Sequence, residues 1–220
     1  MARSIRAADQ VSDTARQSPP APGFDATAGV FRAQDKRPAP LADVDPAQLS
    51  PCQRALLVID GTVTQFLAAC MGEPVRVTRL AQFADVAAAD AQWLDCSADA
   101  AVLRRTAMLS GGHGGQLYAW ADSVILPDRL TAAMRAGLDS EPSGLGQILL
   151  DSGLEQRREA LWFGRLLATE AEMPPAVRAF GNSTFLSRSY RVIAGGQPLM
   201  LITERFPLGS GSVFEDRYPL

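Results

Sequence analysis

The chain has 220 residues, of which 47% are hydrophobic and 20% are charged, and its formal net charge is −3. This is the composition of an ordinary globular protein with one domain and some spare length. The small negative charge argues against a nucleic-acid partner, because nucleic-acid-binding proteins usually present a basic surface. No apolar run reaches the roughly 18–20 residues needed to cross a bilayer, so we expect no membrane partner.

Three cysteines, Cys52, Cys70 and Cys96, are widely spaced along the chain. An odd number at wide spacing differs from the even, dense sets of small secreted domains. We therefore expect three reduced thiols in a cytoplasmic protein. Because the chain has a single histidine and no Cys-x-x-Cys pair, the sequence also predicts no zinc site.

Residues 1–46 differ in composition from the rest of the chain. They are rich in Ala, Pro, Asp, Arg and Ser, and the prolines of 18–22 and 38–40 would interrupt any helix. We predict a disordered N-terminal extension over residues 1–46, followed by one folded domain over residues 47–220. An interaction arm or a partial transit peptide is the alternative for the extension.

Two short helices are expected at the start of the domain. Ser50-Pro51 provides an N-cap and a first-turn proline for the first helix. The second runs over Val63–Met71, between a threonine cap and Gly72. The alternation of apolar and polar residues over Val75–Leu80 then predicts a strand.

The centre of the chain predicts a β-hairpin. Its strands are Ala101–Leu109 and Leu117–Leu126, and the glycine-rich turn between them tolerates unusual backbone angles. We expect a helix to follow, capped by Asp128 and ended by Gly137.

The last third adds one helix and more strands. The helix opens at Ser143 and runs to about Leu150, and Gln156–Leu167 reads as a strand in its later part, with Gly164 suggesting a bulge. Strands at Ser189–Ala194 and Leu199–Phe206 form a second hairpin. Hairpins with interspersed helices predict an α+β fold built on an antiparallel sheet.

Two charged residues fall in otherwise apolar rows of the predicted strands. Arg105 lies on the apolar face of the 101–109 strand, and Glu204 lies on the apolar face of the 199–206 strand. Burying a charge is costly unless the charge is paired or binds a ligand. The two residues are therefore either a buried ion pair, which the pattern alone favours, or the two ends of a pocket for a polar, anionic molecule.

Other segments could contribute to such a pocket. The glycines of Ser143–Gly146 let a ligand approach the start of a helix, whose first amides can bind an anion, although a plain helix cap is the commoner use. The hydroxyls of Asp60–Thr64 could line the rim, or this segment could be only a turn and a cap. We expect His113 to be a solvent-exposed turn residue, and Arg104 to lie on the face opposite to Arg105.

In this order, the features of residues 49–206 resemble those of the chorismate pyruvate-lyases, especially a divergent bacterial branch that makes 4-hydroxybenzoate. The most specific feature is the run Tyr190–Leu199, which continues to Thr203-Glu204. The other matching segments are Asp60–Thr64, Val102–Arg105, Ala121–Pro127 and Gly144–Gly146.

The resemblance implies an antiparallel sheet with helices packed on it and a buried, flap-covered ligand site. It implies that Arg105 and the backbone amide of Leu145 bind the ring carboxylate, while Glu204 reaches the ring hydroxyl at the opposite end. Thr64 and Gly146 complete the expected binding residues. The substrate would be chorismate and the products 4-hydroxybenzoate and pyruvate, formed without a metal or an organic cofactor by a monomer or a dimer.

This chain departs from the family pattern at one position. The family arginine is often followed by Glu, whereas Thr106 follows Arg105 here and points to the other face of the strand. The neighbouring Arg104 creates a one-residue ambiguity in register, and the apolar face selects Arg105. Two rival interpretations are a non-catalytic domain that binds small aromatic acids, as in the effector domains of some bacterial regulators, and an enzyme for another chorismate-derived acid. The absence of a helix-turn-helix pattern in residues 1–46 weighs against the first.

Overall fold

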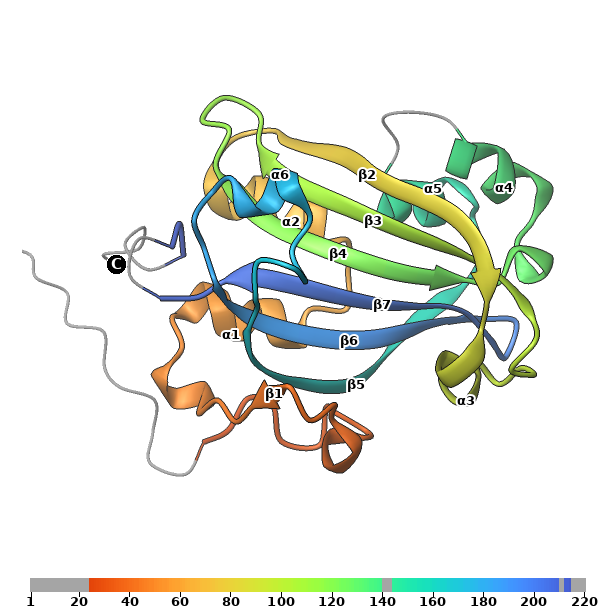
Figure 1. Cartoon of the computed structure of the whole chain (residues 1–220), viewed down its shortest axis with the longest axis horizontal. Coiled ribbons are helices and arrows are strands. Elements are labelled where there is room, and N and C mark those ends of the chain that lie inside the picture. The colour runs from red at the N-terminus through yellow and green to blue at the C-terminus, as the bar shows by residue number, and fades with distance from the viewer. Residues whose placement is uncertain (1–23, 140–143, 210–211, 215–220) are drawn as a thin grey trace, which may run out of the picture.

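A seven-stranded antiparallel sheet forms the centre of the protein (Figure 1). The computed structural model describes residues 24–139, 144–209 and 212–214. The strand order is β1-β5-β6-β7-β4-β3-β2, so the sheet contains both predicted hairpins, and the expected α+β class is confirmed. The strands are β1 (Leu41–Ala42), β2 (Val75–Val86), β3 (Ala101–Gly111), β4 (Leu117–Ile125), β5 (Gln156–Leu167), β6 (Thr184–Ala194) and β7 (Gln197–Pro207).

Helices cover both faces of this sheet unequally. Figure 1 looks onto the more open face, on which α3 and α6 lie, while α1, α2 and α5 lie behind the strands. Among the described residues, no helix is long and apolar enough to cross a membrane. The helices are α1 (Pro51–Val58), α2 (Val63–Met71), α3 (Ala91–Leu94), α4 (Ala132–Asp139), α5 (Leu145–Asp151) and α6 (Pro175–Arg178), with short 3-10 turns at Gln34–Lys36, Pro46–Gln48, Ala88–Asp90 and Pro127–Arg129.

The first helix begins and the second helix ends as their capping residues predict, whereas Thr62 occupies the N-cap position of α2 without a side-chain capping hydrogen bond. The Ser50 side chain accepts a hydrogen bond from the Gln53 amide, and the Gln53 side chain accepts one from the Ser50 amide, so α1 opens with a complete capping box. Gly72 ends α2 in the left-handed conformation (φ 68°), which costs little without a Cβ.

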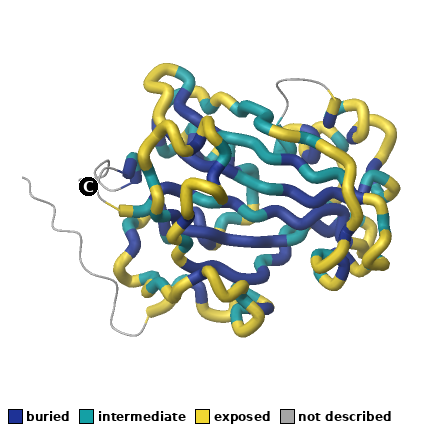
Figure 2. The backbone as a smooth tube through the Cα atoms, in the orientation of Figure 1, coloured by how far each residue is buried: buried dark blue, intermediate teal, exposed yellow. Residues whose placement is uncertain are grey.

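The helix-covered face carries two separate hydrophobic clusters. Leu56, Leu67 and their neighbours in α1 and α2 pack on one part of the sheet, and Met134 and Leu149 of α4 and α5 pack on another. Figure 2 shows that the central strands, on which both clusters pack, are largely buried or of intermediate exposure. The gap where the two clusters meet is the place left for a pocket.

Three local expectations need correction. The helix expected from Asp128 begins later, at Ala132, and its first turn is capped by the Thr131 hydroxyl, which accepts from the Met134 amide. Gly137 lies within α4 rather than after it. The bulge of β5 lies between Ala160 and Trp162 instead of at Gly164.

Gly164 is instead required because another segment of the chain packs closely against it. A Cβ built at this position would lie 2.8 Å from the carbonyl oxygen of Ala42 in β1. The N-terminal segment therefore crosses the edge of β5 at a point where only a glycine fits.

The expected boundary between a disordered extension and the domain is wrong for residues 24–46. The amides of Arg32 and Ala33 donate to the carbonyl groups of Ala160 and Leu161, and Leu41 pairs with Leu166 as β1 joins the sheet. Ala33 and Leu41 are buried in the same cluster as Trp162. This segment is part of the folded domain, and only the expectation for residues 1–23 lies outside the described residues.

Candidate functional site

A pocket of about 610 Å³ lies on the helix-covered face, where the two hydrophobic clusters meet. Its floor is the sheet, and the starts of α2 and α5 form its walls. Small residues on β3 and β4, namely Ala107, Ala121 and Ser123, leave room above the central strands. All five residues expected to bind a ligand line this one pocket: Thr64, Arg105, Leu145, Gly146 and Glu204.

Arg105 enters the pocket from β3 and is 3% exposed. Its Nη1 donates to the side-chain oxygen of Gln82 at 3.0 Å and to the carbonyl oxygen of Leu138 at 3.2 Å. These contacts tie the guanidinium group to β2 and to the end of α4. A buried, oriented arginine can present paired N–H donors to a carboxylate.

Glu204 lies on β7, 7% exposed, and its carboxylate is held by two neighbours on β6. Nε of Arg188 donates to Oε2 at 2.8 Å, and the Tyr190 hydroxyl donates to Oε1 at 3.0 Å. The pattern-based expectation of an ion pair between Arg105 and Glu204 is therefore wrong: Glu204 is in a buried ion pair, but its cation is Arg188.

Arg188 also joins this carboxylate to the helical layer. Its Nη1 donates to the carbonyl oxygen of Ile59 at 3.2 Å, just after the end of α1. Burial raises the pKa of Tyr190 above its ordinary value, and the Glu204 charge adds to the effect. Tyr190 is therefore a neutral hydrogen-bond donor at physiological pH.

Arg105 and Glu204 stand at two separate places on the pocket floor. Arg105 pairs with Ser123 on β4, and Ser123 pairs with Ile202 on β7, two residues before Glu204. Two strand spacings separate their backbones by about 10 Å across the sheet. The small residues of β4 lie between the two positions.

The two glycines at the start of α5 are explained by packing. A Cβ built at Gly146 would lie 2.5 Å from the methyl carbon of Thr62, and one at Gly144 would lie 3.3 Å from Val77. The start of α5 thus approaches the start of α2 so closely that the two loops form one wall. The expected role of Ser143 falls outside the described residues.

Comparison with known proteins places this chain in a family. A sequence profile described as "Chorismate pyruvate-lyase Rv2949c-like" matches residues 57–211. The chain belongs to this family. A chorismate pyruvate-lyase of Mycobacterium tuberculosis is 32% identical over 184 residues, which cover 80% of this chain and 88% of the relative. A chorismate pyruvate-lyase of Mycobacterium leprae is 32% identical over 169 residues, 74% of this chain and 76% of the relative.

Solved structures share the fold at much lower identity. PhnF from Mycobacterium smegmatis aligns with a TM-score of 0.53 and 13% identity, covering 67% of this chain and 64% of PhnF. The separate effector domain of PhnF aligns with the same score and identity, and 88% of that domain is covered. These likenesses concern the fold alone.

Three polar residues of this family member's pocket were not singled out from the sequence. They are Ser123, Arg158 and Tyr190, which lie on β4, β5 and β6. Tyr190 belongs to the Tyr190–Leu199 run that carries the family resemblance, so a signal existed. Arg158 follows another arginine in a strand of ambiguous pattern. The bulge after Ala160 interrupts the alternation of faces, so the faces of residues before it cannot be counted back from Trp162.

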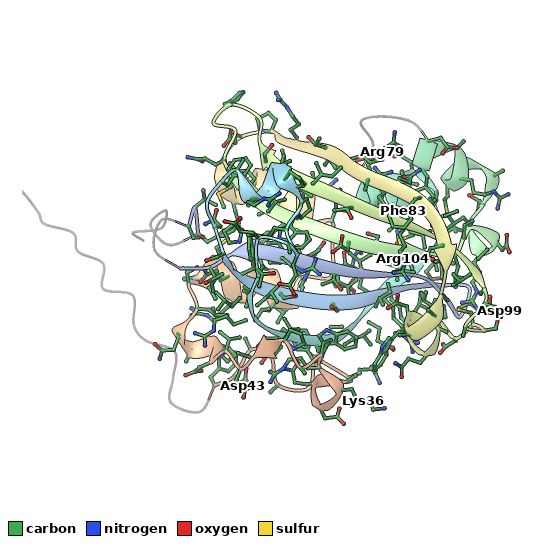
Figure 3. The ribbon with its side chains drawn as sticks, viewed as in Figure 1. Lys36, Asp43, Arg79, Phe83, Asp99 and Arg104 are labelled. Atoms are coloured by element: carbon green, nitrogen blue, oxygen red, sulfur yellow. The ribbon has the colours of Figure 1, made fainter. Side chains whose placement is uncertain are left out.

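The opposite face of the sheet holds a larger groove of about 1460 Å³, which all three tryptophans line. Arg205 in this groove donates to Asp122 at 2.7 Å and lies over the Trp120 ring. Arg104, labelled in Figure 3 beside Phe83 of the neighbouring strand, is likewise paired, with Asp85 and Asp90. The prediction that Arg104 faces away from Arg105 is confirmed, as is the exposure of His113, which is 78% exposed.

Proposed function

We propose that this protein cleaves chorismate into 4-hydroxybenzoate and pyruvate in the pocket between α2, α5 and the sheet. The observation that carries the proposal is that one buried pocket contains an oriented arginine and a buried carboxylate on opposite sides of a floor of small residues. Membership of a family of chorismate pyruvate-lyases supports the choice of substrate.

The ring carboxylate binds at the Arg105 end. The guanidinium group is already oriented by Gln82 and Leu138, so little side-chain freedom is lost when the anion binds. The backbone amide of Leu145, at the start of α5, is a second candidate donor on the same wall. Thr64 and Gly146 shape the adjacent rim.

The ring hydroxyl binds at the Glu204 end. Arg188 and Tyr190 each donate one hydrogen bond to this carboxylate, so Glu204 can only accept from the substrate hydroxyl. Its position next to the hydroxyl-bearing carbon makes it either the general base or the group that holds the ring while the substrate transfers its own proton.

The reaction requires few protein groups. The hydroxyl-bearing carbon loses its proton, the electron pair of that C–H bond completes the aromatic ring, and the neighbouring C–O bond to the enolpyruvyl group breaks. The departing enolate takes up a proton at its methylene carbon and becomes pyruvate. Aromatisation makes the reaction strongly downhill, so orientation in a dry pocket can supply much of the catalysis. We expect no metal or organic cofactor to take part.

Turnover of chorismate by the purified protein tests the proposal. The protein is mixed with chorismate in buffer containing a chelator, and the products are separated by chromatography. We expect equal amounts of 4-hydroxybenzoate and pyruvate, and a loss of about 100-fold or more in kcat for Arg105→Ala and Glu204→Gln.

Two other outcomes would contradict the proposal. Normal turnover in either variant would remove that residue from the site. Binding of chorismate or 4-hydroxybenzoate without turnover by the unaltered protein would identify a non-catalytic domain that binds aromatic acids.

A further inference from the structure

A second arginine lines the pocket at the end opposite to Arg105. Arg158 lies on β5, and its side chain is 13% exposed. Among the described residues of the pocket wall, Arg105 and Arg158 are the two cations. Arg158 therefore places a second, largely buried positive charge next to a site that already holds one oriented arginine.

Arg158 is weakly engaged by the protein itself. Its Nη1 lies 3.8 Å from Oδ1 of Asp60, and the Asp60 side chain is 66% exposed, so water screens this pair. Its buried Nε has no hydrogen-bond partner among the described residues. A buried donor without an acceptor is costly, and a ligand that supplies the acceptor removes that cost.

The position of Arg158 matches the chemistry of the proposed substrate. Arg158 lies on the same face of β5 as Ala160, which pairs with Tyr190 on β6, and Tyr190 donates directly to Glu204. The second positive charge is thus at the end where the ring hydroxyl binds. In chorismate the enolpyruvyl ether is attached to the carbon next to the hydroxyl-bearing carbon, and it carries the second carboxylate of the molecule.

We infer that Arg158 binds the carboxylate of the enolpyruvyl group and stabilises the negative charge of the pyruvate enolate as it leaves. The inference rests on the proposed function and extends it to the second half of the substrate. Arg105 binds the ring carboxylate, which substrate and product share. Arg158 binds the enolpyruvyl carboxylate, which only the substrate carries. The pocket can then favour a dianionic substrate over its monoanionic aromatic product.

The experiment compares two ligands in matched variants. Arg158→Met keeps an unbranched stem and removes the guanidinium charge, Arg158→Lys keeps the charge, and Asp60→Asn removes the charge of the surface partner alone. For each variant kcat and KM are measured with chorismate, and the Kd of 4-hydroxybenzoate is measured by calorimetry. Melting temperatures confirm that each variant is folded.

We expect Arg158→Met to lower kcat/KM for chorismate on the order of 100-fold, because one charged donor to the developing enolate is lost. The Kd of 4-hydroxybenzoate should change by less than about threefold, since the product lacks the second carboxylate. Arg158→Lys should recover part of the loss, and Asp60→Asn should behave as the unaltered protein.

An equal loss for both ligands in Arg158→Met would show a general structural role and overturn the inference, as would unchanged kinetics. If the unaltered protein does not turn chorismate over, the proposed function is wrong. The inference about Arg158 is then tested by measuring the Kd of chorismate in place of kcat/KM. A chorismate-selective loss of binding would then still support the second carboxylate site, and an equal loss would exclude it.

Discussion

The carboxylate of Glu204 is held in place by residues that lie close to it only in the folded sheet. Arg188 and Glu204 are direct partners in the β6–β7 register, and both are buried. A buried ion pair contributes little net stability, yet removing one partner leaves an uncompensated charge. Arg188 is therefore a positioning residue, which orients the carboxylate and joins it to α1.

Replacement of Arg188 tests this interpretation. We expect Arg188→Met to lose about 3–5 kcal/mol of unfolding free energy, because the Glu204 charge stays buried without its cation. In the double variant Arg188→Met/Glu204→Leu, the loss should be smaller than in Arg188→Met alone. Urea denaturation of these two variants and of Glu204→Leu measures the coupling, and simple addition of the two single effects would show that the residues are not coupled.

Glu73 is a second carboxylate whose environment is set by folding. The Tyr118 hydroxyl and the backbone amides of His113 and Gly114 donate to it, and these hydrogen bonds lower its pKa from 4.5 to about 2. Because the folded pKa lies below the ordinary value, Glu73 stabilises the protein above about pH 4.5. This contribution is lost as the pH falls from there toward 2.

The pH dependence of stability should follow from this shift. Glu73→Gln should melt at a lower temperature than the unaltered protein at pH 7, and the difference should shrink as the pH falls below 4.5. Melting curves from pH 7 to pH 3 provide the measurement. A difference that stays constant over this range would mean that the Glu73 charge contributes nothing.

At the scale of elements, the pocket depends on how closely α5 approaches the loop before α2. Gly146 and Thr62 meet where the walls of the pocket join, and no side chain fits between them. The glycine is needed by packing between elements, which a sequence pattern cannot distinguish from a need for ligand contact.

Gly146→Ala should force these two elements apart. The added Cβ would lie 2.5 Å from the Thr62 methyl carbon, and such overpacking typically costs about 1–3 kcal/mol. We expect lower stability and a higher KM for chorismate. Adding Thr62→Ser removes the obstructing methyl group and should restore both properties, and a double variant no better than Gly146→Ala would contradict this packing.

At the scale of the whole molecule, the N-terminal segment completes the sheet. The Gln34 side chain donates to the Phe163 carbonyl group and accepts from its amide, both at 2.9 Å, so it satisfies the edge of β5 as a strand would. Phe31 packs on the Phe163 ring with centroids 4.6 Å apart. Residues 24–46 therefore protect an edge that would otherwise expose backbone groups and Trp162.

Truncation separates the two parts of the N-terminal region. Removal of residues 2–46 should lower the melting temperature by about 5–10 °C, because several backbone hydrogen bonds and two buried apolar side chains are lost. Removal of residues 2–23 is the matched control and should have a much smaller effect. Calorimetry of both truncated proteins decides the matter, and equal melting temperatures would mean that β1 adds no stability.

The sequence by itself determined the first two helices, the two hairpins and the faces of their strands. Local capping residues were sufficient to place α1 and α2, and strand alternation was sufficient to place Arg105 and Glu204 on buried faces, because both signals depend only on neighbours in the chain. The ordered motifs also indicated the family before the fold was known.

Only the tertiary structure decided which residues meet. The register of β6 and β7 assigns Glu204 to Arg188, and the register of β5 with β6 places Arg158 opposite Val192, on the pocket face. Residues 24–46 join the sheet largely through backbone hydrogen bonds, which leave no mark on composition, so a proline-rich segment was expected to be disordered. Pairing across a sheet depends on register between distant segments, and a single sequence carries no direct record of it.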